Sequence, residues 1–166
     1  MSIFAVVFFR SADTWVGIEV DLTESESIDD VADLMRDVAG THGADASEGT
    51  MLLLIEADDE WFGVVRVDDH ADPQVFLSDA RVVREHPLAA LLLESGEIEP
   101  PEQQEEGTGQ KPYPDPGGTA ELLSDIGTSE QDLLSLTLSE GTLPGDVLSI
   151  IAARAGFADY LDSLRI

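Results

Sequence analysis

The chain of 166 residues contains no cysteine, a single lysine and few aromatic residues. Without cysteine there is neither a disulfide framework nor a thiolate metal site, which fits a reducing compartment, and we expect the cytoplasm. The N-terminal apolar run is too short to cross a bilayer and lacks the basic leader and small-residue cleavage site of a signal peptide. We therefore expect a first strand there and no membrane segment.

Basic residues are scarce: eight stand against 35 acidic residues, and the formal net charge is −27. Binding to a phosphate backbone requires lysines and arginines to replace condensed counterions, so we expect no direct nucleic-acid binding. Arg66 lies inside a predicted strand, where an outward-facing charge or an ion-pair partner is the favoured role. The acidity has two interpretations: solubility through self-repulsion in an acid-rich or salt-adapted proteome, or a surface matched to a basic partner.

Catalytic motifs are also missing from the sequence. The three histidines, His42, His70 and His86, stand outside any H-E-x-x-H pattern, and no serine occupies a G-x-S-x-G elbow. No G-x-G-x-x-G or P-loop pattern for nucleotide binding occurs either. We therefore expect a protein that is not an enzyme and that holds no cofactor.

The acids at two neighbouring turns between residues 56 and 72 are the strongest candidates for site chemistry. Carboxylates that loops gather at one end of a sheet would suit a hard cation. Their spacing, however, does not match the calcium-loop pattern, and aspartate is common in turns because its side chain bonds nearby amides. Solvated turns are the favoured interpretation and a metal site is the alternative. The ligands of that site would be Glu56, Asp58, Asp59, Asp68, Asp69 and Asp72.

Hydrophobic periodicity predicts an α+β domain over residues 1–94. Spacing of three and four residues predicts a helix that Ser27 is placed to cap and Gly40 to stop, and a later helix that Pro87 is placed to open. The element order ββαβββα predicts one antiparallel sheet with helices on a face. Apolar and alternating runs place the strands at residues 3–9, 14–20, 51–56, 61–67 and 74–78.

The composition changes after the first domain. Residues 95–117 are rich in acids, proline and glycine with almost nothing apolar, so we predict a flexible linker. Residues 118–166 regain helical spacing and predict a small C-terminal subdomain of three to four helices. A capping box at residues 128–131 is predicted to open one helix, Pro144 another, and Gly156 to end the latter. A unit this small is near the lower size limit for independent folding, so we expect it to dock on the first domain or on a partner.

Aromatic and apolar residues are the candidates for contact with another protein. Each tryptophan begins a strand next to a turn, and the C-terminal leucines suffice for an internal core with some left to offer a partner. Core packing is the favoured interpretation, and a binding hot spot is the alternative. The partner-binding candidates are Trp15, Trp61, Leu133, Leu136 and Phe157.

Several segments, in a fixed order, resemble a known family. They are FAVVFFR (4–10), DDEWFGVVRV (58–67), VFLSDARVVREHPLA (75–89) and, after the acidic linker, ELLSDIGTSEQDLLSL (121–136) with DVLSIIAARAGF (146–157). In this order they resemble the tRNA adenosine deaminase-associated proteins, a group of small acidic proteins of actinobacteria. Residues 21–50 and 111–118 add little to the match, and the pattern departs from the family around residues 139–144.

The resemblance implies association with a tRNA-editing deaminase and implies no catalytic residue set. Such deaminases hold zinc through H-x-E and P-C-x-x-C motifs, which a chain without cysteine cannot supply. The leading hypothesis is a non-catalytic, cytoplasmic partner or modulator of a tRNA adenosine deaminase. Two alternatives stay open. One is a general protein-interaction module unrelated to RNA, with a possible homodimer through a sheet edge; the other is a metal-dependent hydrolase or metal-binding protein that uses the acids at 56–72.

Overall fold

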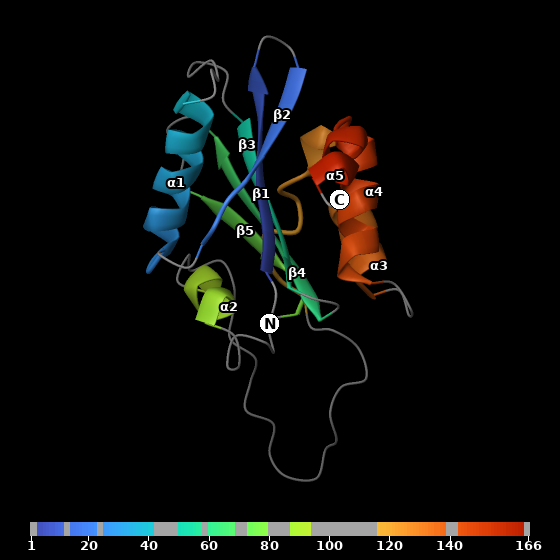
Figure 1. Cartoon of the computed structure of the whole chain (residues 1–166). Helices are drawn as coiled ribbons and strands as arrows, with labels where there is room; N and C mark the ends of the chain where they lie inside the picture. Colours follow the sequence, from blue (N-terminus) through green and yellow to red (C-terminus); the bar gives the residue numbers. More distant parts are fainter. Residues whose placement is uncertain are drawn as a thin grey trace, which may run out of the picture.

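The computed structural model describes residues 3–11, 14–22, 25–41, 50–57, 60–68, 73–79, 87–93, 116–138 and 143–164. In these ranges the chain forms one six-stranded sheet with helices, which confirms the predicted α+β class (Figure 1). The strands are β1 (Ile3–Ser11), β2 (Thr14–Glu19), β3 (Thr50–Ala57), β4 (Trp61–Asp68), β5 (Gln74–Leu77) and β6 (Gly117–Gly118). The helices are α1 (Ile28–Thr41), α2 (Pro87–Leu93), α3 (Glu130–Leu138), α4 (Pro144–Ala155) and α5 (Ala158–Leu164), with a short 3₁₀ helix η2 (Ser124–Ile126).

The sheet is antiparallel throughout, in the order β2-β1-β3-β4-β5-β6. Strands β1, β3 and β4 are inner strands, and their nearly continuous apolar sequences are buried on both faces. The sequence did not predict β6, because two glycines carry no side-chain pattern. Gly118 has a φ of 101°, and a Cβ there would lie 2.1 Å from the carbonyl oxygen of Val75, so this close pairing requires glycine.

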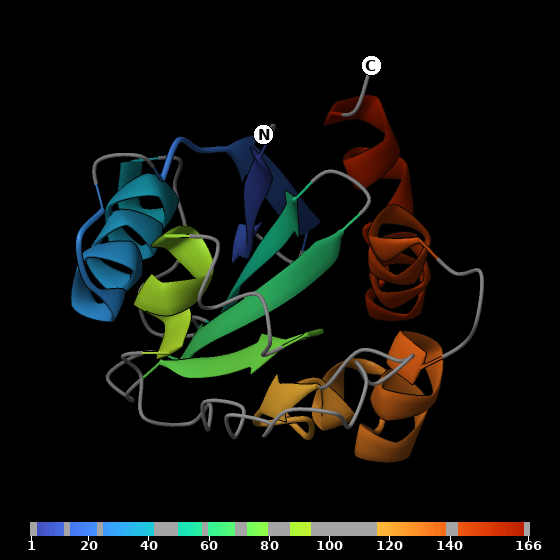
Figure 2. The same ribbon diagram turned by 90° about the horizontal axis from the view of Figure 1, so that it is seen from below.

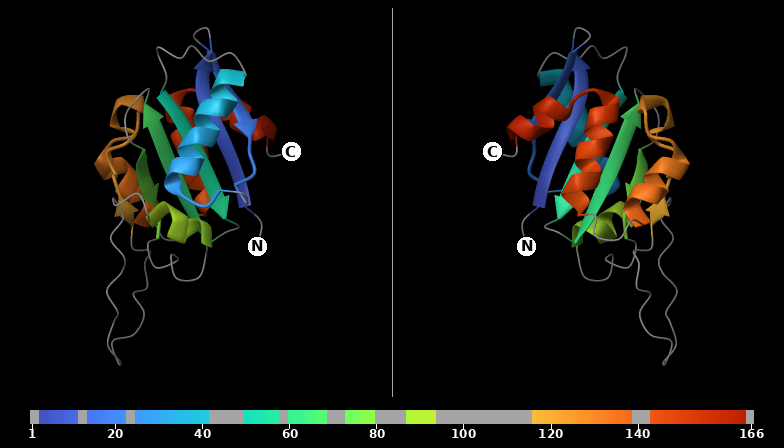
Figure 3. Two further views of the ribbon diagram at one scale, coloured as in Figure 1. Left: turned by 90° about the vertical axis from the view of Figure 1, so that its left-hand side faces the viewer. Right: turned by 90° about the vertical axis from the view of Figure 1, so that its right-hand side faces the viewer.

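Helices cover both faces of the sheet (Figure 2). Alternate strand residues such as Val7, Leu53 and Val65 point toward α1 and α2 and form one core with Met35 and Leu92. Figure 3 shows the same arrangement from the two sides, with α1 crossing one face and α4 the other. The helices of the first half therefore occupy one face only, which leaves the opposite face to the C-terminal segment.

The second core joins the C-terminal segment to the sheet. We call residues 119–138 and 143–164 the C-terminal layer. Its buried residues Leu133 and Ile151 belong to the same cluster as Val6, Leu54 and Phe76 of the sheet. The C-terminal layer thus packs directly on the sheet. Of residues 95–117, which were predicted as a linker, 95–115 lie outside the described residues and Gly117 belongs to β6. The division of the chain into separate domains stays a prediction.

Two helix starts can be compared with the predicted caps. At α1 the backbone N–H of Asp30 donates to Ser27 Oγ at 3.2 Å, which confirms the predicted cap. At α3 the cap lies one residue later than predicted. The N–H of Asp132 donates to Ser129 Oγ at 3.1 Å, and the preceding Thr128 is buried.

Three further helix boundaries agree with the sequence. Pro87 and Pro144 are the first residues of α2 and α4, where a missing N–H costs nothing. Gly156 ends α4 with a φ of 102°, the left-handed conformation that favours glycine. None of the helices within the described ranges combines the length and the apolar character that crossing a bilayer requires.

Candidate protein-interaction site

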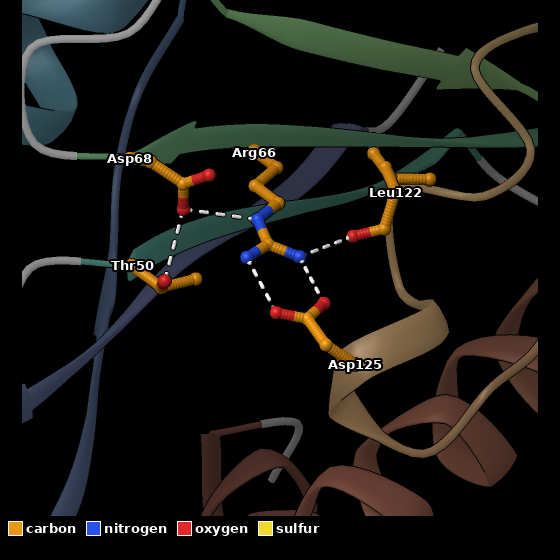
Figure 4. A network of polar contacts seen from close by, with 5 residues as sticks. All are labelled: Thr50, Arg66, Asp68, Leu122 and Asp125. Atoms are coloured by element: carbon orange, nitrogen blue, oxygen red, sulfur yellow. Dashed lines mark hydrogen bonds and ion pairs between the residues drawn. The ribbon is translucent and has the colours of Figure 1, made fainter.

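Arg66 connects the sheet to the C-terminal layer (Figure 4). It lies on the same face of β4 as Phe62 and Val64, which is the face that this layer covers, and only 9% of it is exposed. Its Nη1 donates to the carbonyl oxygen of Leu122 at 2.6 Å and to a carboxylate oxygen of Asp125. Nη2 donates to the other oxygen of Asp125 at 2.9 Å, which completes a bidentate pair.

A second set of contacts fixes the other side of the same guanidinium. Its Nε donates to Asp68 Oδ1 at 3.0 Å, and that oxygen also accepts a hydrogen bond from Thr50 Oγ1 at 2.9 Å. Thr50 and Asp68 are direct partners in the β3–β4 pairing. Of the two roles predicted for Arg66, the ion-pair partner is confirmed and the outward-facing charge is wrong, because the residue is buried. The pair with Asp125 reaches from the sheet to η2.

The electrostatics of this network follow from its hydrogen bonds. The hydrogen bond to Asp125 raises the pKa of Arg66 above its ordinary value. Burial acts in the opposite direction, and the contact with Asp68 adds to the increase. The bond from Arg66 lowers the pKa of Asp125, although burial acts against that change. The contact is therefore charged at neutral pH, and its contribution to stability is lost only when acid protonates Asp125.

Four aromatic rings meet where β1, β2 and α5 adjoin, and we call Phe8, Trp15, Phe157 and Tyr160 the aromatic corner. Phe8 stacks on Phe157 with centroids 4.0 Å apart. Trp15 meets Phe157 edge-on at 5.1 Å, and Tyr160 meets Phe8 edge-on at 6.4 Å. The corner holds four of the ten aromatic residues of the chain. Phe8 and Phe157 are buried, whereas Trp15 is half-buried and Tyr160 is 37% exposed, so two rings reach the surface.

Gly17 makes room for the aromatic corner. It lies directly opposite Phe8 in the β1–β2 pairing. A Cβ at this position would lie 2.5 Å from Cε1 of the Phe8 ring, closer than packed atoms approach. The glycine therefore lets the ring lie across β2 and stack on Phe157.

The described surface offers little positive charge. All three arginines whose side chains are described form ion pairs with aspartates: Arg66 as above, Arg36 with Asp33 at 3.7 Å, and Arg154 with Asp132 at 3.0 Å. Exposed acids occur on both helical layers. They include Asp29 and Asp37 of α1, Glu130 of α3, and Asp159 and Asp162 of α5.

Two of the six candidate metal ligands lie within the described residues, and they are far apart. The β3–β4 pairing places Glu56 opposite Phe62 and Asp68 opposite Thr50, six positions along the hairpin. At about 3.3 Å per residue this is roughly 20 Å. Asp58, Asp59, Asp69 and Asp72 lie outside the described residues. Within the described ranges no group of three or more histidines or acids is arranged to hold a metal ion.

The five partner-binding candidates fall into two groups. Trp61, Leu133 and Phe157 are buried in the two cores, and a partner could reach them only if helices moved away from the sheet. Trp15 and Leu136 are half-buried and reach the surface. Their role in binding stays a prediction.

Three residues of the site were not singled out by the sequence. A glycine inside a strand is a known signal of close approach, and Gly17 could have been found by it. Asp125 and Tyr160 carry no such signal. Their contacts to Arg66 and Phe8 join residues that are far apart in the sequence, so only the packed fold brings them together.

The fold and these contacts define an α+β protein in which one antiparallel sheet carries a helical layer on each face and a buried arginine ties one layer to the sheet. Residues 3–158 match the model of one family, described as "Rv3753c-like tRNA adenosine deaminase-associated protein", and the chain belongs to that family. The resemblance seen in the sequence is thereby confirmed. The description names the family as associated with the deaminase and not as the deaminase itself.

A relative in Mycobacterium tuberculosis (strain ATCC 25618 / H37Rv), "Protein Rv3753c", is 35% identical over 121 residues. The aligned part covers 71% of this chain and 65% of the relative, so the match spans somewhat less than two thirds of the relative's length. No solved structure matches the chain significantly.

Proposed function

We propose that this protein is a non-catalytic partner or modulator of a tRNA adenosine deaminase in the cytoplasm. The observation that carries the proposal is membership of a family described as associated with that deaminase. The sequence agrees with a non-catalytic role because it contains no zinc-deaminase motif and no cysteine to build one.

The charge distribution favours the deaminase, and not its tRNA, as the molecule that this chain binds. A net charge of −27 repels a phosphate backbone, and the three arginines with described side chains already form ion pairs with aspartates. An enzyme that binds tRNA presents positive charge to the RNA. The exposed acids of this chain complement such a surface, which would speed association and select the partner.

The proposal is tested by titrating the purified protein into the deaminase of the same organism. We expect binding by calorimetry and co-elution in gel filtration, with an affinity that falls as salt rises because exposed charges are screened. An unrelated basic protein of similar size and net charge to the deaminase is the control for non-specific attraction. Absence of heat and of co-elution at low ionic strength would contradict the proposal, as would equal affinity for the control.

A subsidiary proposal concerns the surface that is covered on the deaminase. If the acidic protein occupies the basic track that tRNA uses, the two must compete. We expect the affinity of the deaminase for tRNA to fall in proportion to the protein added, as measured by fluorescence anisotropy of labelled tRNA. A ternary complex with unchanged tRNA affinity would show that the protein binds elsewhere on the enzyme.

A further inference from the structure

The structure suggests where the partner is held, an inference that rests on the proposed function. We propose that the aromatic corner is the docking point for an arginine side chain of the deaminase, which stacks against the exposed ring of Tyr160 next to the half-buried Trp15 and pairs with acids of α5 and β2.

The solvent exposure of large apolar side chains points to the aromatic corner. Four large apolar residues of the described ranges are substantially exposed, namely Ile3, Leu138, Leu143 and Tyr160. Tyr160 is the aromatic one among them, and it shares a cluster with the half-buried Trp15. Tryptophan and tyrosine are enriched among the residues that dominate binding energies, since they offer large contact area at a small entropic cost.

The rings are held in place before any partner arrives. Phe157 lies between Phe8, on which it stacks, and Trp15, which meets it edge-on. Tyr160 is fixed against the edge of Phe8, and Leu161 beside it is fully buried. A partner side chain that lands on these rings therefore has little motion to freeze, and preorganisation of this kind increases affinity.

The acidic residues of α5 and β2 favour a positively charged partner side chain. Asp159 and Asp162 are exposed on α5, the helix that carries Tyr160, and Glu19 is exposed on the same face of β2 as Trp15. A guanidinium suits this setting because it stacks on aromatic faces and donates to carboxylates at the same time. A second copy of this chain fits poorly, because each copy carries a net charge of −27.

The test measures binding of the deaminase to variants of the full chain at one low ionic strength. Tyr160→Leu keeps apolar bulk but removes the π face, and we expect it to weaken binding about threefold to thirtyfold. Tyr160→Phe keeps the face and should bind within about twofold of the original chain. Thermal melting of each variant checks that the fold is retained.

Two double variants, each of which removes two acids, provide the matched control. Asp159→Asn with Asp162→Asn removes two exposed acids from α5, the helix that carries Tyr160, and we expect binding to weaken about threefold to tenfold. Asp29→Asn with Asp37→Asn removes the same charge from α1, on the other face of the sheet, and should change binding less than about twofold. This comparison separates a local contact from the general effect of net charge.

The outcomes separate the two proposals. If the original chain binds and these variants bind equally well, or if the α1 pair has the larger effect, the docking point is wrong while the proposed function stands. If the original chain does not bind at all, the proposed function fails and the docking point fails with it. If sedimentation shows a dimer of the free protein that Tyr160→Leu dissociates, the corner joins two copies and the inference is overturned.

Discussion

The two faces of the sheet are covered in different ways. The described residues of the face under α1 and α2 form one cluster of apolar side chains, and α1 follows β2 closely in the sequence. The face under the C-terminal layer is also apolar, but a buried arginine and a stack of aromatic rings cross it. Hydrophobic contact has no direction, whereas hydrogen bonds and ring stacking fix an orientation. The later segment therefore has directional contacts that specify how it sits on the sheet.

The largest expected effects come from deleting matched core side chains on the two faces. Leu53 and Leu54 are neighbours in β3, and each points into one of the two cores. Leu53→Ala and Leu54→Ala should each lower the free energy of unfolding by about 2–5 kcal/mol in urea denaturation. If Leu54→Ala costs much less than Leu53→Ala, the C-terminal layer is not part of the same cooperative unit.

The next effect concerns the arginine that crosses the second face. Arg66→Ala leaves the Leu122 carbonyl without its donor and empties a buried site, and we expect a loss of about 2–4 kcal/mol. Arg36→Ala is the control, because its pair with Asp33 on α1 is exposed and should contribute less than about 0.5 kcal/mol. Equal losses for the two variants in urea denaturation would show that Arg66 does not tie the layers together.

A smaller loss is expected when the aromatic corner is crowded. Gly17→Ala places a methyl group against the Phe8 ring, and we expect about 1–3 kcal/mol of destabilisation by thermal or urea unfolding. Gly40→Ala is the matched control. Gly40 was predicted to stop the helix, but α1 continues through it to Thr41, so that prediction was wrong. Nothing lies within 4 Å of a Cβ there, and alanine favours a helix. Destabilisation by Gly40→Ala equal to that by Gly17→Ala would contradict the close approach of β2 to Phe8.

The smallest effect is a pH dependence of stability. Because Arg66 lowers the pKa of Asp125 in the folded state, this carboxylate stabilises the fold above its unfolded pKa, near pH 4. That contribution is lost as pH falls below this value through the lower folded pKa. Between pH 5 and pH 3, stability of Asp125→Asn measured by urea unfolding should therefore fall less steeply than that of the original chain. An unchanged slope for Asp125→Asn would contradict the assignment.

Local patterns predicted most of the secondary structure. Apolar runs marked five strands within a few residues, and Ser27, Pro87, Pro144 and Gly156 lie at the helix boundaries assigned to them. These signals work because each depends on residues close in the sequence. β6 was missed because its two residues are glycines that pair with β5 through the backbone only.

The contacts of the candidate site depend on residues that are distant in the sequence, and the sequence predicted them less well. Trp15 was singled out by its place at a strand start, but its packing on Phe157 depends on α5. The role of Arg66 as an ion-pair partner was foreseen, whereas its partner Asp125 was not. The acids at 56–72 looked close because their turns are close in the sequence, yet the pairing puts Glu56 and Asp68 at opposite ends of one hairpin.

Hydrogen exchange of the protein alone and in the presence of its cognate deaminase tests the central claim most directly. A deaminase partner that docks at the aromatic corner should slow exchange in β2 (Thr14–Glu19) and α5 (Ala158–Leu164) and leave α1 (Ile28–Thr41) unchanged. Unchanged exchange throughout, or slowing confined to α1, would contradict the account.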